Sequence, residues 1–279
     1  MTTLPTLFVG HGATIFTASR EDPTHAWLSS LAPSVAAVSP RAIVVVSAHH
    51  VTSTDWAVTS SAQPPLKHDH PVTELYAERY APPGDPSLAS QIVQALLAAG
   101  LPARPDPQRG LDHGAWLPLR AMVPHADIPI VMLSVNASAS FEQHVASGAA
   151  LAPLRRDGVL VLASAGVTHN QDEFRKGFFR GADPATGSPE WSVDFDTWVG
   201  QTLAVSERGA RLEALASYGQ RDEYARAPDA RALLAAPRRS RCSRRRTWSA
   251  RAWRVSARAF DVGVPLRAVS RRTDAMIGW

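Results

Sequence analysis

Three apolar, β-branched segments of this chain each end in small residues followed by a histidine. The histidines that close these segments are His11, His49 and His169. Continuous Val/Ile/Leu runs are typical of strands that are buried on both faces of a parallel sheet. The carboxyl ends of such strands meet at one edge, where open α/β sheets bind their ligands. The pattern therefore predicts that imidazoles from separate parts of the chain converge at that edge.

Strands and helices alternate along most of the chain. We expect strands at residues 4–9, 42–48, 128–134 and 159–163. We expect helices at residues 23–31, 72–80, 88–99, 118–123, 140–155 and 188–205. Alternation of this kind is typical of βαβ units. The sequence thus predicts an α/β fold: a single domain with a mostly parallel central sheet flanked by helices, and a metal site at the carboxyl ends of the strands.

Size and composition are those of an ordinary globular protein of 279 residues, 45% of them hydrophobic. No apolar stretch approaches the roughly 18 residues of a membrane-spanning helix. The first residues lack the basic and apolar regions of a signal peptide. The single cysteine, Cys242, cannot form an internal disulfide, which suits a reducing compartment. We expect a cytoplasmic protein that is a monomer or a homodimer.

The chemistry expected at this edge follows from the histidines themselves. Neutral imidazole is the commonest protein ligand of Zn, Fe and Cu. His11 lies between two glycines, which let a ligand approach the backbone closely, and His49 ends a second apolar run in the same manner. A single histidine after a strand more often caps a helix or fills the core, so the repetition is what favours a metal site. His50 points to the other side of an extended chain, and we expect only His49 of this pair to bind metal.

Three further side chains are candidates for substrate contact or proton transfer. His113 lies in a glycine-bounded segment, residues 110–116, that suits a positioned imidazole. His68 lies in a polar loop that could fold over a site, although such loops are often simply solvated. Trp116 could shape an aromatic pocket, although a tryptophan is more often part of the core.

Together these segments resemble the class III extradiol ring-cleaving dioxygenases, in the branch of DOPA 4,5-dioxygenase-like proteins. The resemblance covers about residues 4–230. It is carried by residues 5–12, 42–49, 68–69, 75–76, 80–84, 109–116, 126–131 and 166–170. It implies a metal-dependent enzyme that inserts O2 into a catechol-type, DOPA-like ring and opens it.

The resemblance also implies roles for the histidines. His11 and His49 are metal ligands, and His169 lies at the metal as a ligand or as an acid/base group. His113 lines the substrate pocket as a second acid/base group. The implied cofactor is one divalent metal, Fe(2+) for activity or Zn(2+) as bound, and the partners are a small aromatic substrate and O2. The predicted site is therefore catalytic His113 and His169, substrate-binding His68 and Trp116, and the metal ligands His11, His49 and His169.

The end of the chain departs from the family pattern. The segment after residue 236 contains twelve arginines and two aspartates, so the net charge of +4 comes from this tail. Family members carry another metal-ligand histidine near the C-terminus, and this region contains none. Arginine outnumbers lysine 27 to 2, as in a GC-rich gene, and we infer a change of reading frame near residues 230–240.

This inference divides the chain in two. We expect a catalytic domain at residues 1–235 and an aberrant Arg-rich tail at residues 236–279, frameshifted or disordered. Because the tail accounts for the basic charge, we expect neither a nucleic-acid nor a membrane partner. Resequencing that finds a clean in-frame gene would refute the frameshift.

Two other function classes fit the same residues. A non-enzymatic peptide- or ligand-binding protein could use this fold, because a fold does not determine function. A zinc-dependent hydrolase could use the same histidines, because open sites of this kind activate water. Catechol turnover with O2, peptide capture without turnover, and Zn-dependent cleavage of an ester or amide distinguish the three.

Overall fold

The structure of the chain is a computed structural model that describes residues 3–70, 72–170, 189–221 and 258–260. These residues belong to two compact units: the first holds the described residues up to Gly166 together with residues 258–259, and the second holds those from Val167 to Arg221 together with Phe260. The predicted tail at residues 236–279 lies outside the described residues, apart from residues 258–260.

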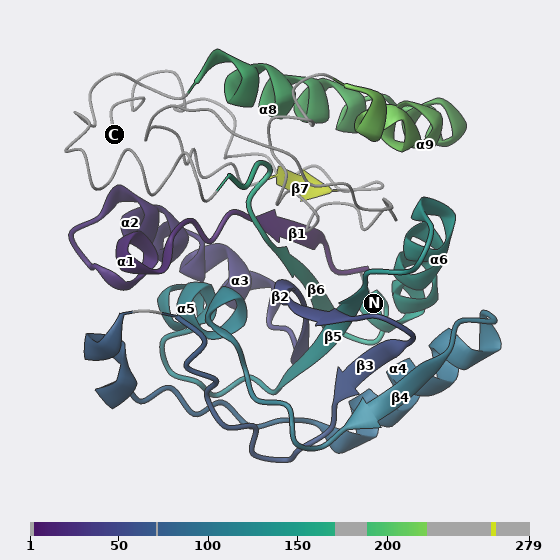
Figure 1. Cartoon of the computed structure of the whole chain (residues 1–279). Helices are drawn as coiled ribbons and strands as arrows, with labels where there is room; N and C mark the ends of the chain where they lie inside the picture. Colours follow the sequence, from purple (N-terminus) through teal and green to yellow (C-terminus); the bar gives the residue numbers. More distant parts are fainter. Residues whose placement is uncertain (1–2, 71, 171–188, 222–257, 261–279) are drawn as a thin grey trace. The chain divides into compact units, whose positions relative to one another are not determined.

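A mostly parallel sheet forms the centre of the first unit (Figure 1). The strand order is β4-β3-β5-β2-β6-β1-β7. The strands are β1 (Thr6–Val9), β2 (Ala42–Thr52), β3 (Trp56–Thr59), β4 (Ala103–Asp106), β5 (Ile130–Asn136), β6 (Val159–Ser164) and β7 (Arg258–Phe260). Among the described strand pairs, only β3 and β5 run antiparallel. The predicted α/β fold with a mostly parallel central sheet is therefore confirmed.

All four predicted strands are present, and three described strands, β3, β4 and β7, were missed. Both β3 and β4 are only four residues long, which is too short for a clear alternation of apolar and polar residues. The segment that forms β4 is also polar and contains Pro105. Proline is tolerated at the edge of a sheet, which is where β4 lies.

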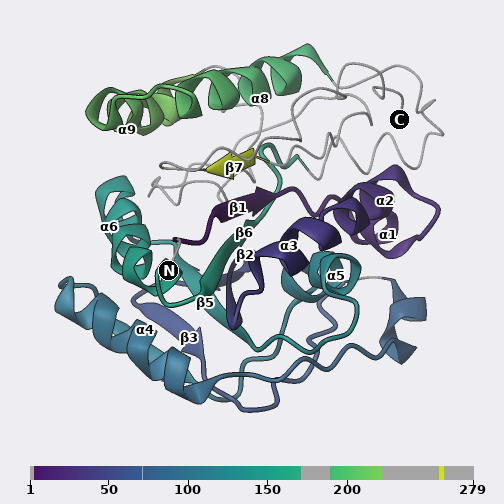
Figure 2. The same ribbon diagram turned by 180° about the vertical axis from the view of Figure 1, so that it is seen from behind.

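Helices cover both faces of the sheet, as Figures 1 and 2 show from opposite sides. One face carries α1 (Thr14–Ala18), α2 (Pro23–Ser30), α3 (Ala32–Val38) and α5 (His113–Met122). The other carries α4 (Pro86–Ala98) and α6 (Phe141–Leu151). Two short 3-10 segments, η1 (Thr73–Ala77) and η2 (Ala152–Arg155), complete the unit. None of the described helices is long and apolar enough to cross a lipid bilayer.

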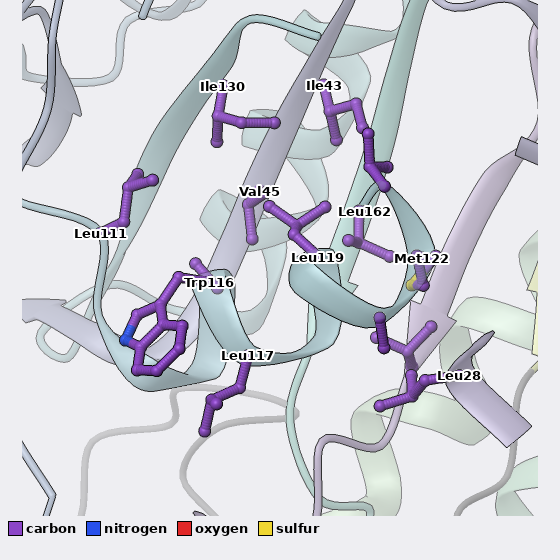
Figure 3. Packing of buried hydrophobic residues seen from close by; sticks show 14 of the residues in the cluster. Leu28, Ile43, Val45, Leu111, Trp116, Leu117, Leu119, Met122, Ile130 and Leu162 are labelled. Carbon is purple, nitrogen blue, oxygen red and sulfur yellow. The ribbon is translucent and has the colours of Figure 1, made fainter. Parts of the chain in front are cut away.

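The apolar residues of the strands contribute side chains to two separate hydrophobic cores, one on each face of the sheet. In β2, Ile43 and Val45 belong to the core under α5, whereas Val44 belongs to the core under α4 and α6. Figure 3 shows the first of these cores, where Leu119 of α5 lies over the strands among Val45 and Leu162. Each fully buried side chain of this size contributes roughly 1.5–3 kcal/mol. The central strands are apolar throughout because neither face of the sheet is left to solvent.

The start of α5 differs from the prediction. We expected a helix from Pro118, because proline is favoured in a first turn, but α5 begins at His113 and contains Pro118 inside it. Asp112 occupies the N-cap position without a side-chain cap hydrogen bond. The prediction placed Pro118 at the start of the helix, whereas the structure places it in the helix interior.

The second unit contains α8 (Glu190–Leu203), α9 (Arg208–Ala216) and the 3-10 segment η4 (Ser217–Gln220). The helix predicted at residues 188–205 corresponds to α8. Within this unit, the ring of Trp198 packs against Phe195, and the guanidinium of Arg221 lies 4.8 Å from the Trp198 ring centroid. Such a cation–π contact adds to the packing of aromatic rings.

Replacing Leu119 by alanine should lower the free energy of unfolding by about 2–5 kcal/mol, because it leaves a cavity in a fully buried position. Urea denaturation measures this loss. Leu97 of α4 is 46% exposed, and Leu97→Ala should change stability by only about 0.5 kcal/mol. Equal losses in the two variants would contradict the packing of α5 on the sheet.

Candidate metal centre

Three imidazoles of the first unit converge on one point. Ring nitrogens of His11, His49 and His113 all lie within 4.8 Å of one another. The Nε2 atoms of His11 and His49 are 3.1 Å apart. Two nitrogens that bind one zinc ion at about 2.0–2.1 Å in tetrahedral geometry lie about 3.3 Å apart. The spacing of His11 and His49 therefore suits a shared metal ion.

Different elements bring the three side chains to this point. His11 follows β1 and precedes Gly12, whose φ of 61° lies in the left-handed region that glycine adopts without strain. His49 lies within β2, which continues past the predicted end of the strand. The pairing of β2 with β5 shifts between Val46 and Val51, and such irregularities re-aim side chains beside functional sites. His113 is the first residue of α5.

A hydroxyl group on the neighbouring strand orients His11. The Nδ1 atom of His11 forms a 2.9 Å hydrogen bond with Oγ of Ser164, which is fully buried at the end of β6. The hydroxyl of Thr17 also donates to the carbonyl of His11. With Nδ1 engaged, Nε2 is the ring nitrogen that faces His49, as in metal sites whose ligands are oriented by a second hydrogen bond.

A buried ion pair holds the backbone of His49. Asp112 is fully buried and accepts hydrogen bonds from Oγ of Ser47 at 2.6 Å and from Nη2 of Arg109 at 2.8 Å. The same Nη2 atom donates to the carbonyl of His49 at 2.9 Å. Oγ of Ser47 accepts the N–H of His49 at 3.2 Å. The N–H and the C=O of His49 are therefore both linked to Asp112, the residue before His113, through Ser47 and Arg109.

A carboxylate orients His113. The Nδ1 atom of His113 donates to Oδ1 of Asp69 at 2.8 Å, and the backbone N–H of His113 donates to the same oxygen at 3.2 Å. Burial alone would raise the pKa of Asp69, but the hydrogen bonds that it accepts from the ring and the backbone of His113 hold this pKa well below its ordinary range. Asp69 is therefore ionised near neutral pH, and it fixes the His113 proton on Nδ1. Carboxylate–imidazole pairs of this kind support both metal ligands and proton-transfer groups.

A second group of rings adjoins the triad. The ring of His70 has its centroid 6.1 Å from that of His113 and 6.0 Å from that of Trp116. His68 lies 5.7 Å from His70 and 6.2 Å from Trp116. Burial, together with the charges of His113 and His68, lowers the pKa of His70. His68 and Trp116, both predicted from the sequence, thus lie in one group beside the triad.

The structure accounts for the predicted site residues in different ways. It brings His11 and His49 together, as predicted, and adds His113 to the same cluster. His169 belongs to the second unit, and its role as ligand or acid/base group stays a prediction. His50 is buried, and burial and the charge of Arg109 lower its pKa to about 4, so that it is neutral near pH 7.

Several residues that support the site are not among the predicted site residues. They are Ser47, Asp69, His70, Arg109, Asp112 and Ser164. Four of them, Ser47, Asp69, His70 and Asp112, stand within two positions of a predicted histidine, and this proximity is the main sequence signal for their role. Ser164 bonds to His11, 153 positions away along the chain, and Asp112 bonds to Ser47, 65 positions away. No local sequence pattern indicates contacts over such separations.

Gly114 should not tolerate a side chain, because a Cβ atom there would lie 2.7 Å from Oγ of Ser47 and 2.8 Å from Cδ2 of His49. We expect Gly114→Ala to weaken metal binding about 10- to 100-fold, since displaced supporting groups cost that much. Helix propensity alone would favour alanine by up to about 1 kcal/mol. Metal titration with a competing chelator measures the effect.

Gly148 of α6 provides the matched control, because nothing lies within 4 Å of a Cβ atom at that position. Gly148→Ala should leave metal affinity unchanged and stabilise the fold by about 0.5–1 kcal/mol. Unaltered metal affinity in Gly114→Ala would show that the triad is not held as closely as described.

Comparisons with known proteins place this geometry in context. The family model described as the catalytic LigB subunit of aromatic ring-opening dioxygenase matches residues 5–231. A 4,5-DOPA dioxygenase extradiol of Beta vulgaris is 33% identical over 201 residues, which are 71% of this chain and 72% of that protein. A protein of the same name from Escherichia coli K12 is 39% identical over 174 residues, which are 61% of each chain. The crystal structure of an uncharacterised protein from Escherichia coli K12 matches with a TM-score of 0.64 and 30% identity, over 83% of this chain and 87% of the other.

Proposed function

This chain belongs to the family of the catalytic LigB subunit of aromatic ring-opening dioxygenases, and on that premise we propose that it opens a catechol-type ring with O2 at a metal held by His11 and His49. The observation that carries the proposal is the 3.1 Å approach of the two Nε2 atoms, with His113 in the same cluster. The relatives named 4,5-DOPA dioxygenase extradiol support a DOPA-like substrate.

The residues present fit a divalent metal. The imidazoles of His11 and His49 supply nitrogen ligands, and the other ring nitrogen of His11 is engaged by Ser164. His113 lies in the same cluster with its Nδ1 engaged by Asp69. A metal bound there, Fe(2+) for turnover or Zn(2+) as isolated, would favour the deprotonated catechol and hold both reactants together. We propose His169 as a further ligand or acid/base group at this metal.

The other residues of the site would transfer protons, contact the substrate and hold His49 in position. With its proton fixed on Nδ1 by Asp69, His113 presents Nε2 as a group that can accept a proton from a catechol hydroxyl and return it to the opened product. Trp116 and His68 would flank the aromatic ring of the substrate. The buried ion pair of Arg109 and Asp112 would keep His49 in place while protons move.

We expect His11→Ala and His49→Ala to lose bound metal, because each removes one of the two nitrogens that face each other. Elemental analysis after reconstitution with Fe(2+) or Zn(2+) measures the loss. His125→Ala serves as the control, because His125 is exposed. Unchanged metal content in both site variants would rule out His11 and His49 as ligands.

His113→Gln and His169→Gln separate proton transfer from metal binding. For a proton-transfer group, we expect metal content to persist while turnover falls about 10²- to 10⁴-fold, the usual contribution of general acid–base catalysis. Metal loss in one of these variants would instead identify that histidine as a ligand. Full turnover by His169→Gln would remove it from catalysis.

Oxygen uptake with a panel of catechols tests the proposed reaction itself. We expect consumption of O2 and a yellow semialdehyde product after anaerobic loading with Fe(2+). The assay should be run on this chain and on a version in which residues 236–279 are restored to the in-frame sequence, because the family's further histidine lies in that region. Metal-loaded protein that consumes no O2 in either form would contradict the proposal, and peptide capture or Zn-dependent ester cleavage would then decide between the other two classes.

A further inference from the structure

The guanidinium group of Arg120 contacts three separate parts of the first unit. Arg120 lies in the last turn of α5, and its side chain is only 13% exposed. Its Nη2 atom donates to the carbonyl of Ala18 at 3.1 Å, and its Nη1 atom lies 2.7 Å from Oε2 of Glu78. Its Cζ atom lies 5.7 Å from the ring centroid of Trp116, within the range of a cation–π contact. Charge-assisted bonds in two directions hold the groups at both ends in defined positions.

The bond to Ala18 connects Arg120 to the segment that carries His11. Ala18 ends α1, which packs with α2 and α5 on one face of the sheet (Figures 1 and 2). Thr17 is almost fully buried, and its hydroxyl donates to the carbonyl of His11, while its own carbonyl accepts a 3.0 Å bond from Nδ1 of His25. A helix of five residues satisfies few of its own carbonyls, because the last four have no partner within the helix. The position of α1, and with it that of His11, therefore depends on side chains of α2 and α5.

The ion pair with Glu78 connects the same guanidinium to the segment that carries Asp69. Glu78 follows directly after η1. Within η1, the hydroxyl of Tyr76 donates to the carbonyl of His70 at 3.0 Å. His70 is the neighbour of Asp69, the carboxylate that orients His113. A shift of η1 would therefore reach Asp69 through the backbone of His70.

An arginine suits these contacts better than a lysine would. Its planar guanidinium offers five N–H donors in fixed directions, whereas the ammonium of lysine is a point charge on a flexible stem. Ion pairs on an exposed surface contribute little to stability. Arg120, however, is mostly buried, and one of its bonds reaches a backbone carbonyl 102 positions away along the chain. Its contacts therefore determine where α1 and η1 lie, and do more than balance surface charge.

We propose that Arg120 is a positioning residue of the metal centre, which holds His11 through α1 and Asp69 through η1. This inference rests on the proposed function, because it assigns Arg120 to the metal and the catechol bound at that site. Arg120 contacts neither of them. It keeps a metal ligand and the partner of His113 at one spacing, so its loss weakens the binding of both the metal and the catechol.

Equilibrium binding tests this role without relying on turnover. The Kd for Zn(2+) is measured on the full chain by competition with a chelator, and the Kd for catechol by anaerobic calorimetry on Zn(2+)-loaded protein. Arg120→Met replaces the guanidinium by an apolar side chain. We expect it to raise the Kd for Zn(2+) about 10-fold, the lower end of the range for groups that support metal ligands, and to raise the Kd for catechol as well. Arg120→Lys keeps the charge but reaches only one acceptor at a time, so its Kd for Zn(2+) should lie between the two.

Arg41→Met is the matched control. Arg41 also donates to a backbone carbonyl, that of Asp157 at 2.7 Å, and lies 3.7 Å from a carboxylate, that of Asp85. It stands directly before β2, at the end of the strand that is remote from His49. Both Kd values should be those of the unaltered chain. All measurements are made well below the Tm of each variant, so that a loss of stability alone does not change them.

A second substitution tests the connection through Thr17. Thr17→Val removes the hydroxyl that bonds the carbonyl of His11 and keeps the shape of the side chain. If Arg120 acts on His11 through α1, the effects of the two substitutions on the Kd for Zn(2+) are coupled. The double variant should then bind Zn(2+) no more weakly than the weaker of the two single variants. Independent structural effects would multiply instead.

The possible outcomes separate this inference from the proposed function. If Arg120→Met binds Zn(2+) and catechol as the unaltered chain does, the positioning role is overturned and the proposed function stands. The same holds if Arg41→Met loses as much affinity, or if the losses multiply in the double variant. Should Arg120→Met fail to fold, Arg120→Lys decides in its place, and an unchanged Kd for Zn(2+) overturns the role. If the unaltered chain binds neither Zn(2+) nor catechol, the proposed function fails and this inference fails with it.

Discussion

The buried ion pair between Arg109 and Asp112 is the interaction on which the rest of the site depends. A charge removed from water is tolerated only when its partners satisfy it fully, and loss of one partner costs about 3–5 kcal/mol. Here Asp112 accepts hydrogen bonds from Ser47 and Arg109, and these two residues in turn hold the N–H and the C=O of His49. Strand β2 and helix α5 are therefore linked at the point where β2 presents His49 and α5 presents His113.

The ion pair of Arg109 and Asp112, with its hydrogen bonds to Ser47 and His49, explains two departures from regular secondary structure. The pairing of β2 with β5 shifts after Val46, and the side chains of Ser47 and Arg109 provide backbone hydrogen bonds to His49 within the irregular stretch. Asp112 occupies the N-cap position of α5 but does not cap it, because its carboxylate is used within the ion pair. Gly114 follows in the first turn, where only a residue without a side chain allows β2 to approach so closely.

Much of this fold could be predicted from the sequence, because its main signals are local. The apolar runs that form β1, β2, β5 and β6 are continuous since both faces of the sheet are covered, and His11 and His49 stand at or near their ends. The short strands β3 and β4 left no comparable signal, because four residues show no clear alternation. The start of α5 was misplaced because a proline is usually found in the first turn of a helix, whereas Pro118 lies inside α5.

By itself, the sequence determined the class of fold, the four strands β1, β2, β5 and β6 of the sheet, and the two imidazoles of His11 and His49 that these strands bring to one edge. Only the tertiary structure decided that His113 joins them, that Asp69 and Ser164 orient the rings, and that His70 links this centre to Trp116. The physical reason is distance along the chain. Hydrogen bonds between residues 44, 65 and 153 positions apart form only after the strands and helices have packed, and no local pattern records them.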